Sequence, residues 1–344
     1  MADGRIAQLE RLTEQQRYLE VMELAPALLA ERSRGLWAYG HFFLGQALNR
    51  LTRPEEAIEH LVEARALFEA LDEPWLAAEC LEWEACARYL KEDATAQGMA
   101  REALRRYREL EPRAAEVESR MLEHLGTILV RHQDFVRGRD CYEEALRVAG
   151  RRLDISRLAR IYHGLGTCHA NLGEVKLAVE LMSRAVTLYR VENDIRAQET
   201  RVDLPRAEND LGMCYLTLGD LGRAEEQFQA ALDHLAETGV ERLRSRVLLS
   251  LAAIHQARGR FDDALRLIGH AIGLAERFDE RIALATAYQQ LGELHAATGA
   301  GDLADESFER ALAILERAGL DEPAAQCRAA RARAREARRR ASQG

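Results

Sequence analysis

The chain has 344 residues, of which 47% are hydrophobic and 31% are charged, and its formal net charge is −9. The hydrophobic fraction excludes a disordered chain, and the charged fraction, with no run of about 18 apolar residues, excludes a bundle of membrane-spanning helices. The segment from Met1 to Leu12 lacks the apolar core of a secretory signal, so we expect a cytoplasmic protein.

The first segment, residues 1–34, predicts one degenerate helical unit. The stretch from Tyr18 to Glu31 has the pattern of the second helix of a helix pair, and Pro26 interrupts it. We therefore place a first domain at residues 1–34, ahead of a regular array that begins at residue 35.

The array, residues 35–322, contains seven units that repeat about every 40 residues. Each unit has a small residue after its first turns, in most cases a second small residue twelve positions later, and then a large apolar residue four further on. An alanine follows in every unit. The first small residues are Gly45, Ala85, Gly126, Gly166, Gly212, Ala252 and Gly292, and the closing alanines are Ala64, Ala103, Ala145, Ala185, Ala231, Ala271 and Ala311.

This spacing has a physical cause. Offsets of three, four and seven residues place side chains on one face of an α-helix, where small residues let a neighbouring helix approach closely. Glycine accepts the left-handed conformation that ends a helix, so a glycine seven positions after the first small residue marks a turn. Each unit is therefore predicted to be a helix, a tight turn and an antiparallel helix. The turn glycines are Gly173, Gly219, Gly259 and Gly299.

One step of the repeat is longer than the others. Gly166 and Gly212 are 46 residues apart, which gives the segment 190–205 about six extra residues. A longer helix and a looped insertion both accommodate this length, and the sequence does not distinguish them.

Residues 323–344 predict a final helix and tail that cap the last unit. The segment from Ala324 to Gly344 has seven arginines and one acidic residue, Glu336, so the rest of the chain is strongly acidic. An acidic body does not favour nucleic-acid binding, and a solvated, arginine-rich capping helix accounts for the tail.

The pattern resembles the tetratricopeptide repeat (TPR) in a long form of about 40 residues. The unit that resembles it best contains Leu211, Gly212, Met213, Cys214, Tyr215, Ala224, Phe228 and Ala231. The resemblance implies an all-α fold, an α-solenoid in which about 7–8 antiparallel helix pairs form a right-handed superhelix with a C-terminal capping helix. It also implies that the first helices of the pairs line a concave binding face.

A row of arginines is predicted on that face. Six residues before the first small residue, four consecutive units carry an arginine: Arg120, Arg160, Arg206 and Arg246. Guanidinium groups bind carboxylates and phosphates bidentately, so the row predicts an acidic ligand. The alternative is that these arginines pair with acids along their own helices, as Arg120 would with Glu123.

Other inward positions add polar and aromatic side chains to the predicted site. The amides among them can hydrogen-bond the backbone of an extended peptide. These residues are Phe42, Asn49, His163, Asn171, Asn209 and Gln289.

No motif for catalysis, phosphate binding or metal binding occurs, and no two of the six cysteines form a C-x-x-C pair. We therefore expect no enzymatic activity, no cofactor and no metal. The predicted function is a scaffold that binds an extended, acidic protein or peptide segment. The alternative is a peptide-sensing TPR regulator that acts on a separately encoded transcription or response regulator. Membranes and nucleic acids are not expected partners, and homo-oligomerisation is left open.

Overall fold

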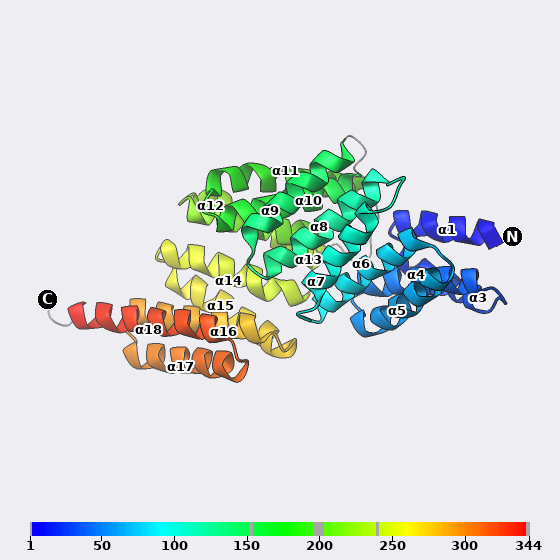
Figure 1. Ribbon diagram of the computed structural model, residues 1–344. Helices are drawn as coiled ribbons and strands as arrows, with labels where there is room; N and C mark the ends of the chain where they lie inside the picture. The colour runs from blue at the N-terminus through cyan, green and yellow to red at the C-terminus, as the bar shows by residue number, and fades with distance from the viewer. Residues whose placement is uncertain (1, 151–153, 196–202, 239–240, 342–344) are drawn as a thin grey trace. The chain divides into compact units, whose positions relative to one another are not determined.

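The computed structural model describes residues 2–150, 154–195, 203–238 and 241–341, and every regular element in these ranges is helical (Figure 1). The helices divide into two compact units, residues 1–177 and residues 178–344. Each unit is described by itself. None of the described helices is long and apolar enough to cross a lipid bilayer.

Unit 1 begins with three helices in the segment predicted to be degenerate. Pro26 separates the second helix from the third, as expected. Helix pairs follow, and the last helix, α11 (Val175–Ile195), begins at the end of unit 1 and lies mostly in unit 2. The helices are α1 (Ala2–Glu14), α2 (Tyr18–Leu24), α3 (Pro26–Leu29), α4 (Arg34–Arg50), α5 (Pro54–Ala70), α6 (Pro74–Leu90), α7 (Ala96–Arg108), α8 (Ala115–Arg131), α9 (Phe135–Ala149), α10 (Ile155–Asn171) and α11 (Val175–Ile195).

Unit 2 contains three further helix pairs and one closing helix. They are α12 (Asp203–Thr217), α13 (Leu221–Thr238), α14 (Glu241–Ala257), α15 (Phe261–Arg277), α16 (Arg281–Ala297), α17 (Gly301–Arg317) and α18 (Asp321–Ala341). The segment predicted to be an insertion, residues 190–205, is helical up to Ile195 and again from Asp203, and residues 196–202 lie outside the described ranges.

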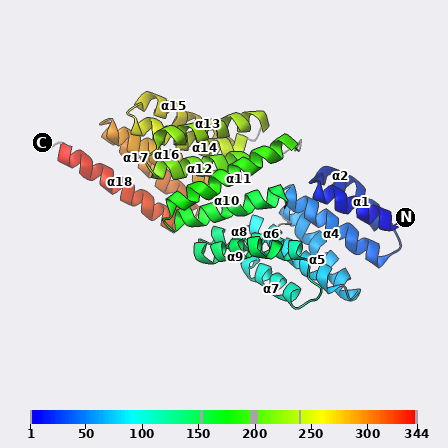
Figure 2. The same ribbon diagram turned by 90° about the horizontal axis from the view of Figure 1, so that it is seen from above.

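In each unit the first helices of the pairs form a layer of their own. Unit 1 packs α4 on α6, α6 on α8 and α8 on α10, and unit 2 packs α12 on α14, α14 on α16 and α16 on α18 (Figure 2). First helices also pack on the second helices that follow them, as α4 does on α5 and α16 on α17. The predicted solenoid of antiparallel helix pairs is confirmed.

The repeated small residue is where the two helices of a pair meet. A Cβ added to Gly212 would lie 2.6 Å from Cε1 of Phe228, a ring that is fully buried. Glycine therefore lets α13 place an aromatic ring against the backbone of α12. The same contact between the first small residue and the large apolar residue recurs at Gly45–Leu61, Gly126–Tyr142 and Gly292–Phe308.

The turn between the two helices has the predicted left-handed residue. Gly173, Gly219, Gly259 and Gly299 have φ between 73° and 85°. In the first three repeats the equivalent residue adopts the same conformation without being glycine. These residues are Thr52, Glu92 and Gln133, at φ 57°, 59° and 60°. The turn is a property of the repeat geometry, and glycine relieves its cost where it occurs.

The arginines of α18 hold that helix to α17. The buried face of α18 consists of small side chains, Ala324, Cys327 and Ala330, so apolar contact contributes little area. Ion pairs supplement it. They join Arg328 to Glu316, Arg331 to Asp305 and Glu309, Arg335 to Asp305, and Arg338 to Asp302.

The docking of α18 is expected to weaken on acidification. Hydrogen bonds from Arg335 and Arg331 lower the pKa of Asp305 below its ordinary 3.8. A lowered pKa stabilises the folded state above pH 3.8, and this contribution is lost as the pH falls below that value. Asp305→Asn should therefore raise the amide hydrogen-exchange rate of α18 at pH 7. Asp302→Asn, at a fully exposed side chain 3.8 Å from its arginine, should leave it unchanged.

Candidate functional site

The first-helix face of unit 1, formed by α4, α6, α8 and α10, carries two of the four predicted arginines. Arg120 of α8 donates to Glu79 at 2.7 Å and to Glu82 at 2.8 Å, both on the preceding first helix, α6. Its side chain is 15% exposed and that of Glu82 is 2% exposed. His124 contacts the same carboxylate at hydrogen-bond distance, with its Nδ1 2.7 Å from Oε1 of Glu82. Arg120 therefore links two repeats.

Arg160 makes the same kind of contact one repeat later, still within unit 1. It donates from Nε to Oε1 of Glu123 at 2.7 Å, and Glu123 lies on α8 while Arg160 lies on α10. Arg157, also on α10, has Nε 3.9 Å from the other oxygen of Glu123. The arginines of unit 1 thus pair with the neighbouring repeat. The alternative of pairing along the helix is wrong for Arg120, because its partners are Glu79 and Glu82 rather than Glu123.

These buried carboxylates are held in the ionised form. Burial alone would raise the pKa of Glu82, but the charges and hydrogen bonds of Arg120 and His124 outweigh it and lower the pKa to about 2. Glu123 behaves in the same way, and chiefly Arg160 offsets its burial to lower the pKa to about 2. Burial lowers the pKa of His124 by more than Glu82 raises it.

The first-helix face of unit 2, formed by α12, α14 and α16, carries the other two arginines in a different state. Arg206 of α12 and Arg246 of α14 are exposed, and neither has an ion pair within the described ranges. For Arg246 the difference follows from one position, three residues before the small residue of the preceding first helix. Unit 1 has Glu82 and Glu123 there, whereas α12 has Asn209, which carries no charge to offer Arg246.

Asn209 ties the two first helices of unit 2 together. Its Oδ1 accepts a hydrogen bond from Ser250 Oγ of α14 at 3.2 Å, and its Nδ2 donates to Asp210 at 3.2 Å. The side chain of Asn209 is buried. Met213, one turn further along α12, is 43% exposed. This face therefore presents two arginines without an ion pair among the described residues, and it also carries an exposed apolar side chain.

The remaining predicted site residues have other partners. Phe42 is buried among aromatic rings, with its centroid 6.1 Å from that of Phe68. Asn49 is buried and donates to the backbone oxygen of Trp83 at 3.0 Å. Asn171 and Gln289 donate within their own helices, at 2.8 Å and 3.0 Å.

His163 is half-buried on α10, where its backbone oxygen accepts from Thr167 at 3.0 Å. The structure adds two acids that were not among the predicted site residues, Glu82 and Glu123. A signal existed for the two acids, because each stands 37 or 38 residues before its arginine.

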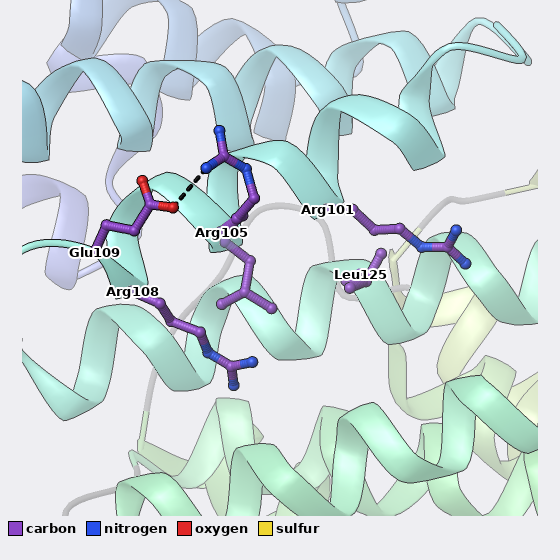
Figure 3. Close-up of a pocket in the computed structure, with 6 residues that line it drawn as sticks. Arg101, Arg105, Arg108, Glu109 and Leu125 are labelled. Carbon is purple, nitrogen blue, oxygen red and sulfur yellow. Dashed lines mark hydrogen bonds and ion pairs between the residues drawn. The ribbon is translucent and has the colours of Figure 1, made fainter.

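A hollow of about 300 Å³ lies on a different surface, beside α7, which is a second helix (Figure 3). Arg105 points to Glu109 across 2.5 Å, and Arg108 is engaged by Glu118 at 2.8 Å. Two of its arginines therefore already have counter-charges. The lining residues are Arg101, Leu104, Arg105, Arg108, Glu109 and Leu125.

Solved structures similar to this chain are helical-repeat proteins. A Rap protein complexed with Competence and Sporulation Factor is 13% identical, with 98% of each chain covered and a TM-score of 0.68. The quorum sensor NprR from B. thuringiensis is 14% identical over 91% of this chain and 87% of that one, with a TM-score of 0.71. BtubC from P. vanneervenii is 20% identical over 68% and 92%, with a TM-score of 0.53. At these identities the likeness concerns the fold.

Comparison with curated protein sequences gave no match. Two families described as tetratricopeptide repeat do match the chain, one over residues 117–190 and 243–317 and the other over residues 206–233. These ranges contain five of the first small residues identified in the sequence, from Gly126 to Gly292. With the paired helices and the glycine–ring contacts described above, they show that the chain belongs to the tetratricopeptide repeat family.

Proposed function

We propose that this chain is a non-enzymatic binding protein whose first-helix faces hold an extended, acidic segment of a protein or peptide. The observation that carries the proposal is the state of Arg206 and Arg246. They occupy equivalent positions on adjacent helices, they are exposed, and within the described ranges no carboxylate pairs with them. A guanidinium without a partner can bind an incoming carboxylate without first breaking an ion pair.

The spacing of the two arginines defines the ligand. Packed helices lie about 10 Å apart, and an extended chain advances about 3.3 Å per residue, so acids about three residues apart would reach both arginines. Arg120 and Arg160 contribute differently in this proposal. Each is already bound by a buried glutamate, so a ligand carboxylate would have to share or displace that contact.

A second candidate function is favoured by the similar structures. The Rap protein with its bound factor and the quorum sensor NprR match nearly the whole chain or most of it. By that analogy the chain would sense a peptide and act on a separately encoded transcription or response regulator. Both candidates share a peptide ligand, and they differ in whether the peptide changes the affinity for a second protein.

Binding of defined peptides tests the proposal. A fluorescent peptide of about ten residues with glutamate at every third position should bind, and the affinity should fall as salt screens the exposed charges. The same peptide with lysine in place of each glutamate should not bind. Equal anisotropy changes for both peptides would contradict the proposal, because they would show no preference for acidic groups.

A further inference from the structure

Trp83 of α6 is the centre of an aromatic and cationic cluster on the first-helix face of unit 1. The guanidinium carbon of Arg50, on α4, lies 4.9 Å from the centroid of its ring, and that of Arg120, on α8, lies 5.6 Å away. The ring of His124 meets it edge-on at 5.1 Å. Three consecutive first helices therefore converge on one indole.

Two hydrogen-bond donors in this cluster are buried and have no acceptor among the described residues. They are Nε1 of Trp83, in a residue 5% exposed, and Nε of Arg50. Buried indole and guanidinium N–H groups normally have partners, because leaving one unsatisfied costs its full desolvation penalty. Both donors belong to groups of the same stack, and an oxygen-containing group is the acceptor that such donors bind.

The charge of Arg50 is also uncompensated. In the part of the chain that the structure describes, Arg50 makes no ion pair, whereas Arg120 on the same ring has Glu79 and Glu82. The charge of Arg50 helps to lower the pKa of Glu123. The carboxylate oxygens of Glu123, however, are bound by Arg160 and approached by Arg157. The stack thus contains one cation with two carboxylate partners, Arg120, and one cation, Arg50, without an ion pair among the described residues.

We propose that Arg50 and Trp83 form an oxyanion subsite, which takes a carboxylate or phosphate group. Such a group would neutralise Arg50 and accept hydrogen bonds from Nε of Arg50 and Nε1 of Trp83. Arg50 itself is half-buried, so part of its side chain is in contact with solvent. The inference rests on the proposed function only in treating the first-helix face as the ligand side, since the subsite lies in unit 1 and Arg206 and Arg246 lie in unit 2.

The indole N–H signal of Trp83 provides a direct test in the full-length protein. The chain has three tryptophans, so a ¹H–¹⁵N spectrum contains three indole signals, and Trp83→Phe assigns the one of interest. Titration with N-acetylglutamate tests a carboxylate source, and titration with inorganic phosphate tests the other. We expect a saturable downfield shift of this signal by at least one probe, with a dissociation constant of about 1 mM or below.

The variant Arg50→Gln should abolish that saturation, while Arg53→Gln, at an exposed side chain paired with Glu56, should not. A shift that rises linearly without saturating, or one that saturates equally in Arg50→Gln, overturns the proposal. If Arg50→Gln fails to fold, Trp83→Phe is the second variant, because it keeps an aromatic ring at this position and removes the indole N–H donor. In this variant, probe binding is followed by the Nε–H signal of Arg50. Trp83→Phe should weaken the affinity for the probe about tenfold, and an unchanged affinity overturns the proposal.

The outcome is separable from that of the peptide experiment. Arg206→Glu/Arg246→Glu should leave the titration of Trp83 unchanged, because those residues belong to the other unit. If the wild-type protein does not bind the acidic peptide but Trp83 titrates with a small probe, the proposed function alone is contradicted. If the wild-type protein binds the peptide but Trp83 shows no saturable response to N-acetylglutamate or phosphate, the subsite alone is contradicted.

Discussion

Replacing Glu82 by alanine is expected to lower the free energy of unfolding by about 3–5 kcal/mol, the typical cost of breaking a buried ion pair by removing one partner. Glu82 is 1% exposed and accepts from both Arg120 and His124. Its removal leaves a buried guanidinium with Glu79 alone and a buried imidazole without its carboxylate. Urea denaturation followed by circular dichroism measures the loss.

Glu102→Ala is the matched control. Glu102 also binds two arginines, Arg105 and Arg106, but it lies on the exposed surface of α7. Its removal should change stability little, because exposed ion pairs contribute little to folding. A similar loss in both variants would contradict the assigned role of burial.

The buried ion pair of Glu82 with Arg120 also predicts a pH dependence of stability. The pKa of Glu82 is lowered from 4.5 to about 2, so its stabilising contribution is complete above pH 4.5 and is lost as the pH falls toward 2. Glu82→Gln should flatten the fall in stability across this range. A variant with the same slope as wild type would show that other carboxylates account for it.

The fold could be read from the sequence because several repeats share the same packing contact between a small residue and a large apolar one. Gly212 and Phe228 are 16 positions apart, and a residue larger than glycine would collide with the ring. Selection for close approach therefore leaves a periodic trace. The turns at Thr52 and Gln133 left no such trace, because those residues adopt positive φ without being glycine.

The site was predicted less completely, and the reason is physical. The row of arginines is a correct observation about sequence position, but whether an arginine is available to a ligand depends on the acid opposite it on the preceding repeat. Glu123 forms an ion pair with Arg160, whereas Asn209 has no charge to pair with Arg246, which is exposed. A residue's own helix does not contain this information. The stack of Arg50 on Trp83 likewise joins two repeats and has no local signature.

Reversing both exposed arginines, in Arg206→Glu/Arg246→Glu, should weaken binding of the acidic peptide about 100-fold or more. Each charged hydrogen-bonded contact contributes about 1.5–3 kcal/mol, and the new carboxylates repel the ligand. The melting temperature should change little, because neither arginine has a partner within the described ranges to lose.

The control reverses two exposed arginines on second helices of the same unit, in Arg266→Glu/Arg310→Glu. It makes the same change in net charge away from the first-helix face. Equal weakening by the two double variants would indicate a non-specific effect of net charge.

The most direct test of the account is a charge exchange between protein and ligand. Isothermal titration calorimetry would measure wild type and Arg206→Glu/Arg246→Glu, each against the glutamate peptide and against its lysine counterpart. The account predicts a crossed result, in which wild type binds only the acidic peptide and the reversed protein binds the basic one. Retained preference for the acidic peptide by the reversed protein would contradict the claim that these two arginines receive the ligand.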